Sequence, residues 1–268
     1  MLRKLTTCLL AVMVALGCGV CEAFPLGYAV ATDDNLYEVD LGNATASLIG
    51  PLWTGAHAVP EGLALSPGGL LYCTDADGVL YSVDSNTGTA TRIGDTGRDN
   101  IEGLDFLGST LIGIDFLAGT PTVFSMDTSD ASTTDIVTAT TSIGLVRSMT
   151  VLDSNTVLIR ADTGATTSDL MDLNLTTGGV STIGTLSIPG TLMPGLDFAL
   201  DGTLYGLDDT GAVLTINPST AGTTVVGDTG DQFWLGLAAQ DVLIPEPATL
   251  SLLALGGLGL LARRRRKR

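Results

Sequence analysis

The chain of 268 residues contains one histidine, and no motif for nucleophilic catalysis accompanies it. This residue, His57, stands in the segment GAHAVPEG. A Ser-His-Asp or Cys-His arrangement needs a base within hydrogen-bond reach of its nucleophile. Zinc sites need clustered His and Cys residues, and the sequence has no such cluster. We therefore predict no catalytic residue and no zinc site, and interpret His57 as an ordinary loop residue.

Carboxylates are the other residues that could do chemistry, because oxygen-rich turns can hold calcium with six to eight ligands. The segments DADG and DDTG are such turns, but neither continues into the twelve-residue calcium loop that ends in Glu. Asp also caps tight turns, and this interpretation is favoured. We expect no cofactor, with calcium as the alternative. The residues concerned are Asp33, Asp34, Asp75, Asp77, Asp115, Asp162, Asp208 and Asp209.

These carboxylates recur because the chain repeats itself. YAVATDDNLYEVD, YCTDADGVLYSVD and YGLDDTGAVLTIN align without a gap, and two further copies carry three extra residues. The copies close with Asp or Asn at positions 40, 84, 127, 174 and 217. Ten residues later four copies have Gly, whereas the third is interpreted as a longer copy that reaches Gly144. A period in this range, with four short strands in each unit, predicts the blades of a β-propeller.

A second marker precedes each unit and predicts the inner strand of each blade. The tyrosine or isoleucine segment is then the second strand, L-Y-x-V-D the third and T-x-x-I-G the fourth. Alternating apolar and polar residues favour strands here. The markers are EGLAL at Glu61, EGLDF at Glu102, RSMTV at Arg147, PGLDF at Pro194 and LGLAA at Leu235.

The two ends of the repeat region complement each other. The last marker has no outer strands after it, and the first outer strands, from Gly27 to Gly50, have no inner strand before them. Pairing the two would complete a blade and close the ring. We therefore predict an all-β fold, a five-bladed propeller over residues 24–243. The alternative is a six-bladed ring with a degenerate blade in residues 116–150.

Inner strands of a propeller line its axis, so equivalent residues of different blades should converge there. Glu61, Glu102 and Arg147 are predicted to form a charged cluster at one mouth of the channel. Asp105 and Asp197 share one register with Thr150, and these three residues point into the channel or face the neighbouring blade. We predict a small-ligand or cation site from these residues; the alternative is a structural ring of ion pairs.

The predicted propeller is strongly acidic. Residues 24–243 contain four basic residues and 27 acidic ones, a net charge of −23. Such a surface repels phosphate backbones, which excludes nucleic acid as a partner. Three of the four cysteines lie near the N-terminus, so Cys73 has no partner for an internal disulfide.

Both ends of the chain look like targeting segments. Arg3 and Lys4 precede an apolar stretch and a small-residue cleavage site, which predicts a signal peptide over residues 1–23. At the other end Pro245, Glu246 and Pro247 precede a largely apolar run of 15 residues and six basic residues. A stable membrane span needs about 20 apolar residues, so residues 244–268 favour a temporary anchor with its basic end in the cytoplasm. A permanent anchor is the alternative.

This order of Pro-Glu-Pro, apolar run and basic cluster resembles the PEP-CTERM sorting signal of exported bacterial proteins. The resemblance covers about the last two dozen residues. It implies transient insertion of the apolar helix into the inner membrane and processing near Pro-Glu-Pro by an exosortase, a transpeptidase-like membrane protease. It also implies delivery to the cell surface or the extracellular matrix, and says nothing of the propeller's ligand.

Two classes of function follow. The first is a non-enzymatic surface or matrix protein whose propeller binds a glycan, a cation or a protein, with exopolysaccharide and surface proteins as expected partners. The second is an extracellular hydrolase or lyase that uses carboxylates at the channel. Propeller folds host both classes, so the fold does not choose between them.

Overall fold

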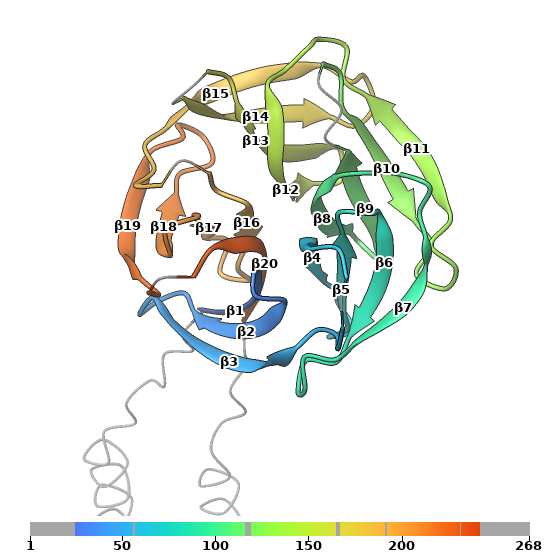
Figure 1. The fold of residues 1–268 in the computed structure, drawn as a ribbon. Coiled ribbons are helices and arrows are strands. Elements are labelled where there is room, and N and C mark those ends of the chain that lie inside the picture. The colour runs from blue at the N-terminus through green and yellow to red at the C-terminus, as the bar shows by residue number, and fades with distance from the viewer. Residues whose placement is uncertain are drawn as a thin grey trace, which may run out of the picture. The chain divides into compact units, whose positions relative to one another are not determined.

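The computed structural model describes residues 25–55, 57–115, 119–164, 167–190, 192–230 and 232–241. Within these ranges the chain is all-β, and its strands form five four-stranded antiparallel sheets arranged as a ring (Figure 1). The five-bladed propeller is therefore confirmed, and the six-bladed alternative is wrong. The predicted signal peptide over residues 1–23 and the sorting segment over residues 244–268 lie outside the described residues.

The blades are numbered here in chain order, and each begins with its inner strand. Blade 1 consists of β20 (Trp234–Asp241), β1 (Pro25–Ala31), β2 (Asn35–Asp40) and β3 (Thr45–Pro51). Blade 2 consists of β4 (Pro60–Leu65), β5 (Leu71–Asp75), β6 (Val79–Val83) and β7 (Ala90–Asp95). Blade 3 consists of β8 (Ile101–Leu107), β9 (Thr110–Asp115), β10 (Thr122–Met126) and β11 (Thr133–Thr138). Blade 4 consists of β12 (Leu145–Asp153), β13 (Thr156–Asp162), β14 (Ser168–Asn174) and β15 (Val180–Leu186). Blade 5 consists of β16 (Gly195–Phe198), β17 (Leu204–Leu207), β18 (Ala212–Ile216) and β19 (Thr223–Asp228).

The ring closes in blade 1, where the last strand pairs with the first. β20 and β1 run antiparallel from the pair Pro25 and Asp241 to the pair Ala31 and Trp234. Trp234 is fully buried, and its ring meets the edge of the Tyr37 ring at 5.1 Å between centroids. The predicted closure by both ends of the repeat region is confirmed.

The hydrophobic core lies between blades. Five clusters of buried apolar side chains each combine residues of two neighbouring blades, one cluster at each junction of the ring. At the junction of blades 5 and 1, for example, Leu207 and Val213 pack with Val39 and Trp234. Each blade is thus stabilised by the blades on either side of it.

The small residue at the second position of each inner-strand marker has a steric cause. A Cβ atom on Gly103 would lie 2.6 Å from the backbone nitrogen of Met149, and one on Gly236 would lie 2.6 Å from the carbonyl oxygen of Glu61. Neighbouring inner strands approach too closely there for a side chain. Ser148 is the exception, and its hydroxyl donates a hydrogen bond of 3.1 Å to the carbonyl of Met193.

The closing Asp or Asn of each repeat caps the turn between the third and fourth strands. Asp40, for example, accepts hydrogen bonds from the backbone nitrogens of Gly42 and Asn43, and Asn217 accepts one from Ser219. Four residues after each cap the backbone is left-handed. These residues are Ala44 (φ 51°), Gly88 (φ 79°), Ala131 (φ 65°), Gly178 (φ 70°) and Ala221 (φ 58°).

Each left-handed residue docks against the fourth strand of the preceding blade, and the two contacting residues have complementary sizes. The Cβ atoms of Ala131, Ala221 and Ala44 face Gly94, Gly184 and Gly227, where an added Cβ would lie 2.8–3.2 Å away. The junction of blades 1 and 2 is the exception, since Gly88 docks on Gly50 and both residues are glycine. A Cβ atom on Gly88 would lie 2.4 Å from the carbonyl oxygen of Gly50. The ten-residue spacing between cap and glycine therefore marks the contact between blades.

Blade 3 keeps this contact with the sizes exchanged. In blade 2 the repeat glycine, Gly94, pairs with Leu80, and in blade 3 the equivalent pair is Val137 with Val123. Val137 therefore takes the place of the glycine, and the interpretation of a longer third copy that reaches Gly144 was wrong. The valine is accommodated because its partner in blade 4 is Gly178. A Cβ atom on Gly178 would lie 2.3 Å from the carbonyl oxygen of Thr138.

Gly178→Ala should therefore cost more stability than the left-handed backbone alone explains. Gly202 is the matched control, since its φ is +82° and nothing lies within 4 Å of an added Cβ. We expect Gly202→Ala to cost about 1 kcal/mol, and Gly178→Ala to cost about 2 kcal/mol more because of the collision. Denaturant unfolding measures both. Equal losses for the two variants would contradict the docking of Gly178 against blade 3.

Candidate functional site

The predicted mouth cluster lies where the inner strands begin. Arg147 Nη1 stands 3.7 Å from Glu102 Oε1, and Arg147 Nε donates a hydrogen bond of 2.9 Å to Asp162 Oδ2. Glu61 of the preceding blade is close enough that its charge acts on Glu102. The structure thus brings Glu61, Glu102 and Arg147 together, and Asp162 joins them from the end of β13.

Both glutamates of this cluster hold protons more tightly than a free glutamate. Burial raises the pKa of Glu61 to about 7, and the negative charge of Asp75 adds to the effect. Burial also raises the pKa of Glu102 to about 7, with a further contribution from Glu61 and an opposing one from Arg147. Oε2 of Glu61 is buried without a hydrogen-bond partner. The mouth therefore holds two carboxyl groups that titrate near neutral pH.

A buried arginine, Arg160, is linked to the mouth cluster through Asp162. Arg160 is fully buried in β13, and its Nη2 lies 2.6 Å from Asp162 Oδ1 and also contacts the hydroxyl of Ser168. Burial lowers the pKa of Arg160 to about 10, while Asp162 opposes the shift. Asp162 thus lies between two arginines. The sequence analysis did not identify Arg160 as part of the site. The only sign of it was one arginine within the otherwise mainly apolar strand segment VLIRAD.

The second predicted register joins blades 3, 4 and 5. The Thr150 hydroxyl lies 3.0 Å from Asp105 Oδ2 and 3.0 Å from Asp197 Oδ1. Asp105 also accepts a hydrogen bond from the backbone nitrogen of Val151, and Asp197 accepts one from Ala239. Of the two orientations left open by the sequence, the structure shows contacts that cross to the neighbouring blades.

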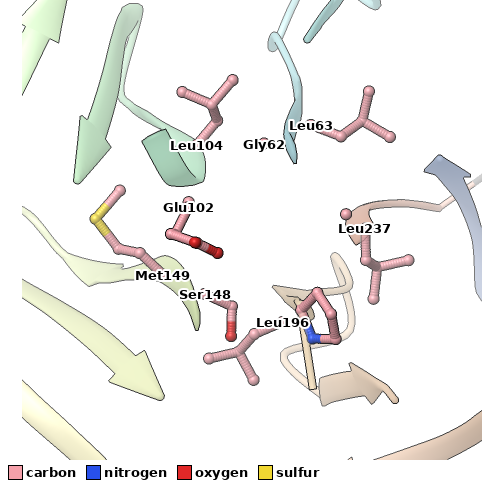
Figure 2. A pocket seen from close by; sticks show the side chains of 11 residues that line it. Gly62, Leu63, Glu102, Leu104, Ser148, Met149, Leu196 and Leu237 are labelled. Carbon is pink, nitrogen blue, oxygen red and sulfur yellow. The ribbon is translucent and has the colours of Figure 1, made fainter. Parts of the chain in front are cut away.

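The space on the axis is small. Residues of all five inner strands line it, and it admits the centre of a water molecule over only about 10 Å3. Figure 2 shows the Glu102 carboxylate turned toward this space, while Leu63, Leu104 and Met149 point away from it. A volume of about this size holds one water molecule, so a larger ligand would have to bind outside the mouth.

Three of the carboxylates that follow the second strands, those of Asp33, Asp75 and Asp208, are occupied by their own turns. Asp162 instead contacts Arg147 and Arg160, and Asp115 contacts Arg98. Asp75 accepts hydrogen bonds from the backbone nitrogen of Val79 and from the Tyr81 hydroxyl, the latter at 2.8 Å. Asp33 accepts one from Tyr37 in the same way, and Asp208 binds the backbone nitrogens of Thr210 and Ala212. The interpretation of these residues as turn caps is supported. Among the described residues no group of His, Cys, Asp and Glu is arranged to hold a metal ion.

His57 lies at the exposed end of a stack of rings. Its ring centroid is 5.0 Å from that of Trp53, and the ring centroid of Trp53 is 5.2 Å from that of Tyr81.

Cys73 is buried in β5 as a free thiol.

A ligand-sized hollow, which the sequence did not predict, lies on blade 4 beside the connection that leads to it from blade 3. Its volume is about 350 Å3, and none of its lining side chains is charged. Part of its wall is the connection from β11 to β12, where Ile143 forms an isolated bridge with Gly119. This connection lies in the stretch where the repeat is least regular. The lining residues are Thr141, Ser142, Ile143, Gly144, Thr163, Met171, Val180 and Thr182.

Comparison with known proteins identifies the tail and supports the fold. Residues 243–267 match the PEP-CTERM protein-sorting motif, and Pro245, Glu246 and Pro247 lie within the match. The chain therefore carries a PEP-CTERM motif, which implies export, processing by the membrane protease exosortase and sorting to the cell surface. No curated protein matches the chain. Within the described residues there is no helix with the length and apolar character to cross a membrane.

One solved structure with a TM-score above 0.5 shares the fold at low sequence identity. A chain in the crystal structure of a nidogen/laminin complex is 14% identical, with a TM-score of 0.51 over 80% of this chain and 97% of that chain. A chain of hydrazine synthase from Kuenenia stuttgartiensis is 17% identical, with a TM-score of 0.44 over 78% and 68% of the two chains. A protein of unknown function from Bacteroides caccae is 9% identical, with a TM-score of 0.44 over 77% and 73%. At 14% identity the likeness to the chain of the nidogen/laminin complex concerns the fold alone.

The raised pKa values of Glu61 and Glu102 predict a protein that is more stable in mild acid. The folded chain binds these protons more tightly than the unfolded chain, so the stabilisation is complete below about pH 4.5 and is lost as the pH rises to about 7. Each shift corresponds to about 3 kcal/mol at most, reduced by solvent at the mouth. Thermal unfolding should therefore show a higher Tm at pH 5 than at pH 8.

Glu102→Gln should flatten this dependence, because glutamine does not titrate. Glu38→Gln is the matched control, since Glu38 is exposed on β2. A Tm difference between pH 5 and pH 8 that is the same in wild type and Glu102→Gln would contradict the burial of a titrating carboxyl at the mouth.

Proposed function

We propose that this chain is a non-enzymatic propeller that binds a neutral glycan at the cell surface, in the hollow that blade 4 forms with the connection from β11 to β12. The observation that carries the proposal is a contrast of size. The hollow measures about 350 Å3, whereas the axis has about 10 Å3. Binding sites for small ligands usually have volumes of about 300–1,000 Å3.

The chemistry of the hollow favours a neutral, hydroxyl-rich ligand. Thr141, Ser142, Thr163 and Thr182 contribute hydroxyl groups, which both donate and accept hydrogen bonds. Ile143 and Val180 add apolar surface that a sugar ring can cover. An anionic ligand would be repelled by the net charge of −23 over residues 24–243.

The proposed setting agrees with the sorting motif. The motif implies that the chain reaches the cell surface, and a neutral exopolysaccharide is the partner proposed for it there. Localisation in the extracellular matrix is part of the proposal. A rigid ring stabilised at every blade junction suits a module that holds a ligand without changing shape.

A hydrolase or lyase at the mouth is the second candidate, and one observation favours it. The pKa values of Glu61 and Glu102 are raised to about 7, where a carboxyl group works as a general acid or base. The small axial space argues against it, because a sugar substrate would have to reach these groups from outside the mouth. Release of reducing ends from polysaccharide, lost in Glu102→Gln, would favour this candidate over the first.

A glycan screen on residues 25–241, which contain all five complete blades, tests the first proposal. Ser142→Ala and Thr182→Val should each weaken a glycan that binds by about 5- to 10-fold, the usual effect of one lost hydrogen bond. Thr224→Val, on the exposed fourth strand of blade 5, is the matched control. Binding that survives both substitutions in the hollow would contradict its assignment.

The site residues that the sequence analysis predicted at the channel are tested on the same glycan. The triple variant Glu61→Gln, Glu102→Gln and Asp105→Asn should bind it with unchanged affinity by calorimetry, because none of the three lines the hollow. Loss of binding in a folded triple variant would move the site to the channel mouth, as the sequence analysis predicted. Ca2+ titrated into the wild type in the same instrument tests the predicted cation site.

A further inference from the structure

The contacts around Thr150 need one more hydrogen atom than the chain supplies. Asp105 and Asp197 together take part in six contacts of hydrogen-bond length. Four come from backbone N–H groups, which supply four hydrogens. The other two both come from the Thr150 hydroxyl, which has a single hydrogen to donate.

The four backbone contacts leave no ambiguity about where the shortage lies. Phe106 and Val151 donate to the two oxygens of Asp105 at 2.6 Å each. Phe198 and Ala239 donate to the two oxygens of Asp197 at 2.8 Å and 2.7 Å. If both carboxyl groups were ionised, the Thr150 oxygen would lie 3.0 Å from one carboxylate oxygen with no hydrogen between them.

We infer that Asp105 and Asp197 together hold one proton at neutral pH and that the Thr150 hydroxyl links the two carboxyl groups. A protonated carboxyl donates to the Thr150 oxygen, and the Thr150 hydroxyl donates to the ionised partner. All six contacts then contain a hydrogen. Rotation of the hydroxyl reverses the order, so the proton belongs to the pair.

Among the residues that the structure describes, no positive charge is found to act on Asp105 or Asp197. At the same level of the ring, β4 has Ala64 and β20 has Ala238. On β17 the residue paired with Asp197 is Tyr205, a phenol that is neutral at pH 7. Arg147 stands three residues before Thr150, where it contacts Glu102 and Asp162.

Burial acts in the same direction as the hydrogen count. It raises the pKa of Asp105, against the lowering effect of its hydrogen bonds. It raises the pKa of Asp197 well above its usual range, and the charge of Asp105 adds to the shift. A proton thus occupies the position at which the sequence analysis predicted a small ligand or a cation. Through Thr150 it links the inner strands of blades 3, 4 and 5.

Carbon-13 NMR of the side-chain carboxyl groups in wild-type residues 25–241 tests the inference directly. The two signals are assigned through the amides of Phe106 and Phe198, and exposed Asp201 serves as the internal reference. At pH 7 Asp105 and Asp197 together should show one protonated carboxyl, judged against the signal of Asp201. Full ionisation of both at pH 7, with or without added Ca2+, would overturn the inference.

Asp197→Asn supplies a second readout. In the wild type this pair should make the equilibrium constant for unfolding rise by up to tenfold per pH unit once the pH exceeds the ordinary pKa range of Asp. Asp197→Asn removes one titrating group and should lack this rise. Asp201→Asn, which keeps its turn cap, should retain the wild-type dependence. An identical pH dependence in Asp197→Asn and wild type would overturn the inference. If Asp197→Asn does not fold, the wild-type spectrum decides alone.

Discussion

The pairing of β20 with β1 is the interaction on which the rest of the structure depends. A blade has a free apolar face on each side, and only a neighbouring blade covers it, so an open arc would leave two such faces in water. The strand pair that joins Trp234 to Ala31 closes the arc into a ring. Every one of the five hydrophobic clusters then lies between two blades. Closure also fixes how near the inner strands stand to one another on the axis.

That nearness explains both the sequence marker and the chemistry of the axis. The inner strands are so close that Gly103 and Gly236 have no room for a Cβ atom. Polar side chains at other positions of these strands are therefore pressed against the next blade. Asp105 reaches the backbone of blade 4, and Asp197 reaches that of blade 1. Carboxyl groups held in this way are desolvated, which is why they retain protons in a strongly acidic chain.

The sequence predicted the blades because their contacts are periodic. The closing Asp of each repeat caps a turn and the glycine ten residues later receives the turn of the next blade, so both recur at a fixed spacing. The same reasoning failed in blade 3, where Val137 and Gly178 exchange the usual sizes. The spacing rule considers one position at a time, so it does not detect that two residues 41 positions apart, Val137 and Gly178, have exchanged large and small side chains. Arg160 was missed for a related reason, because its burial and its contact with Asp162 depend on three-dimensional packing.

The hollow shows what repetition leaves out. The repeat places the turn of each blade on the fourth strand of the preceding blade, in blade 3 as elsewhere. Where it is least regular, between β11 and β12, the connection through Ile143 leaves about 350 Å3 open. Repeats that specify a ring also specify how its gaps are filled, so a ligand-sized space arises where the repeat breaks. In this chain the residues that interrupt the pattern are thus better candidates for function than those that form it.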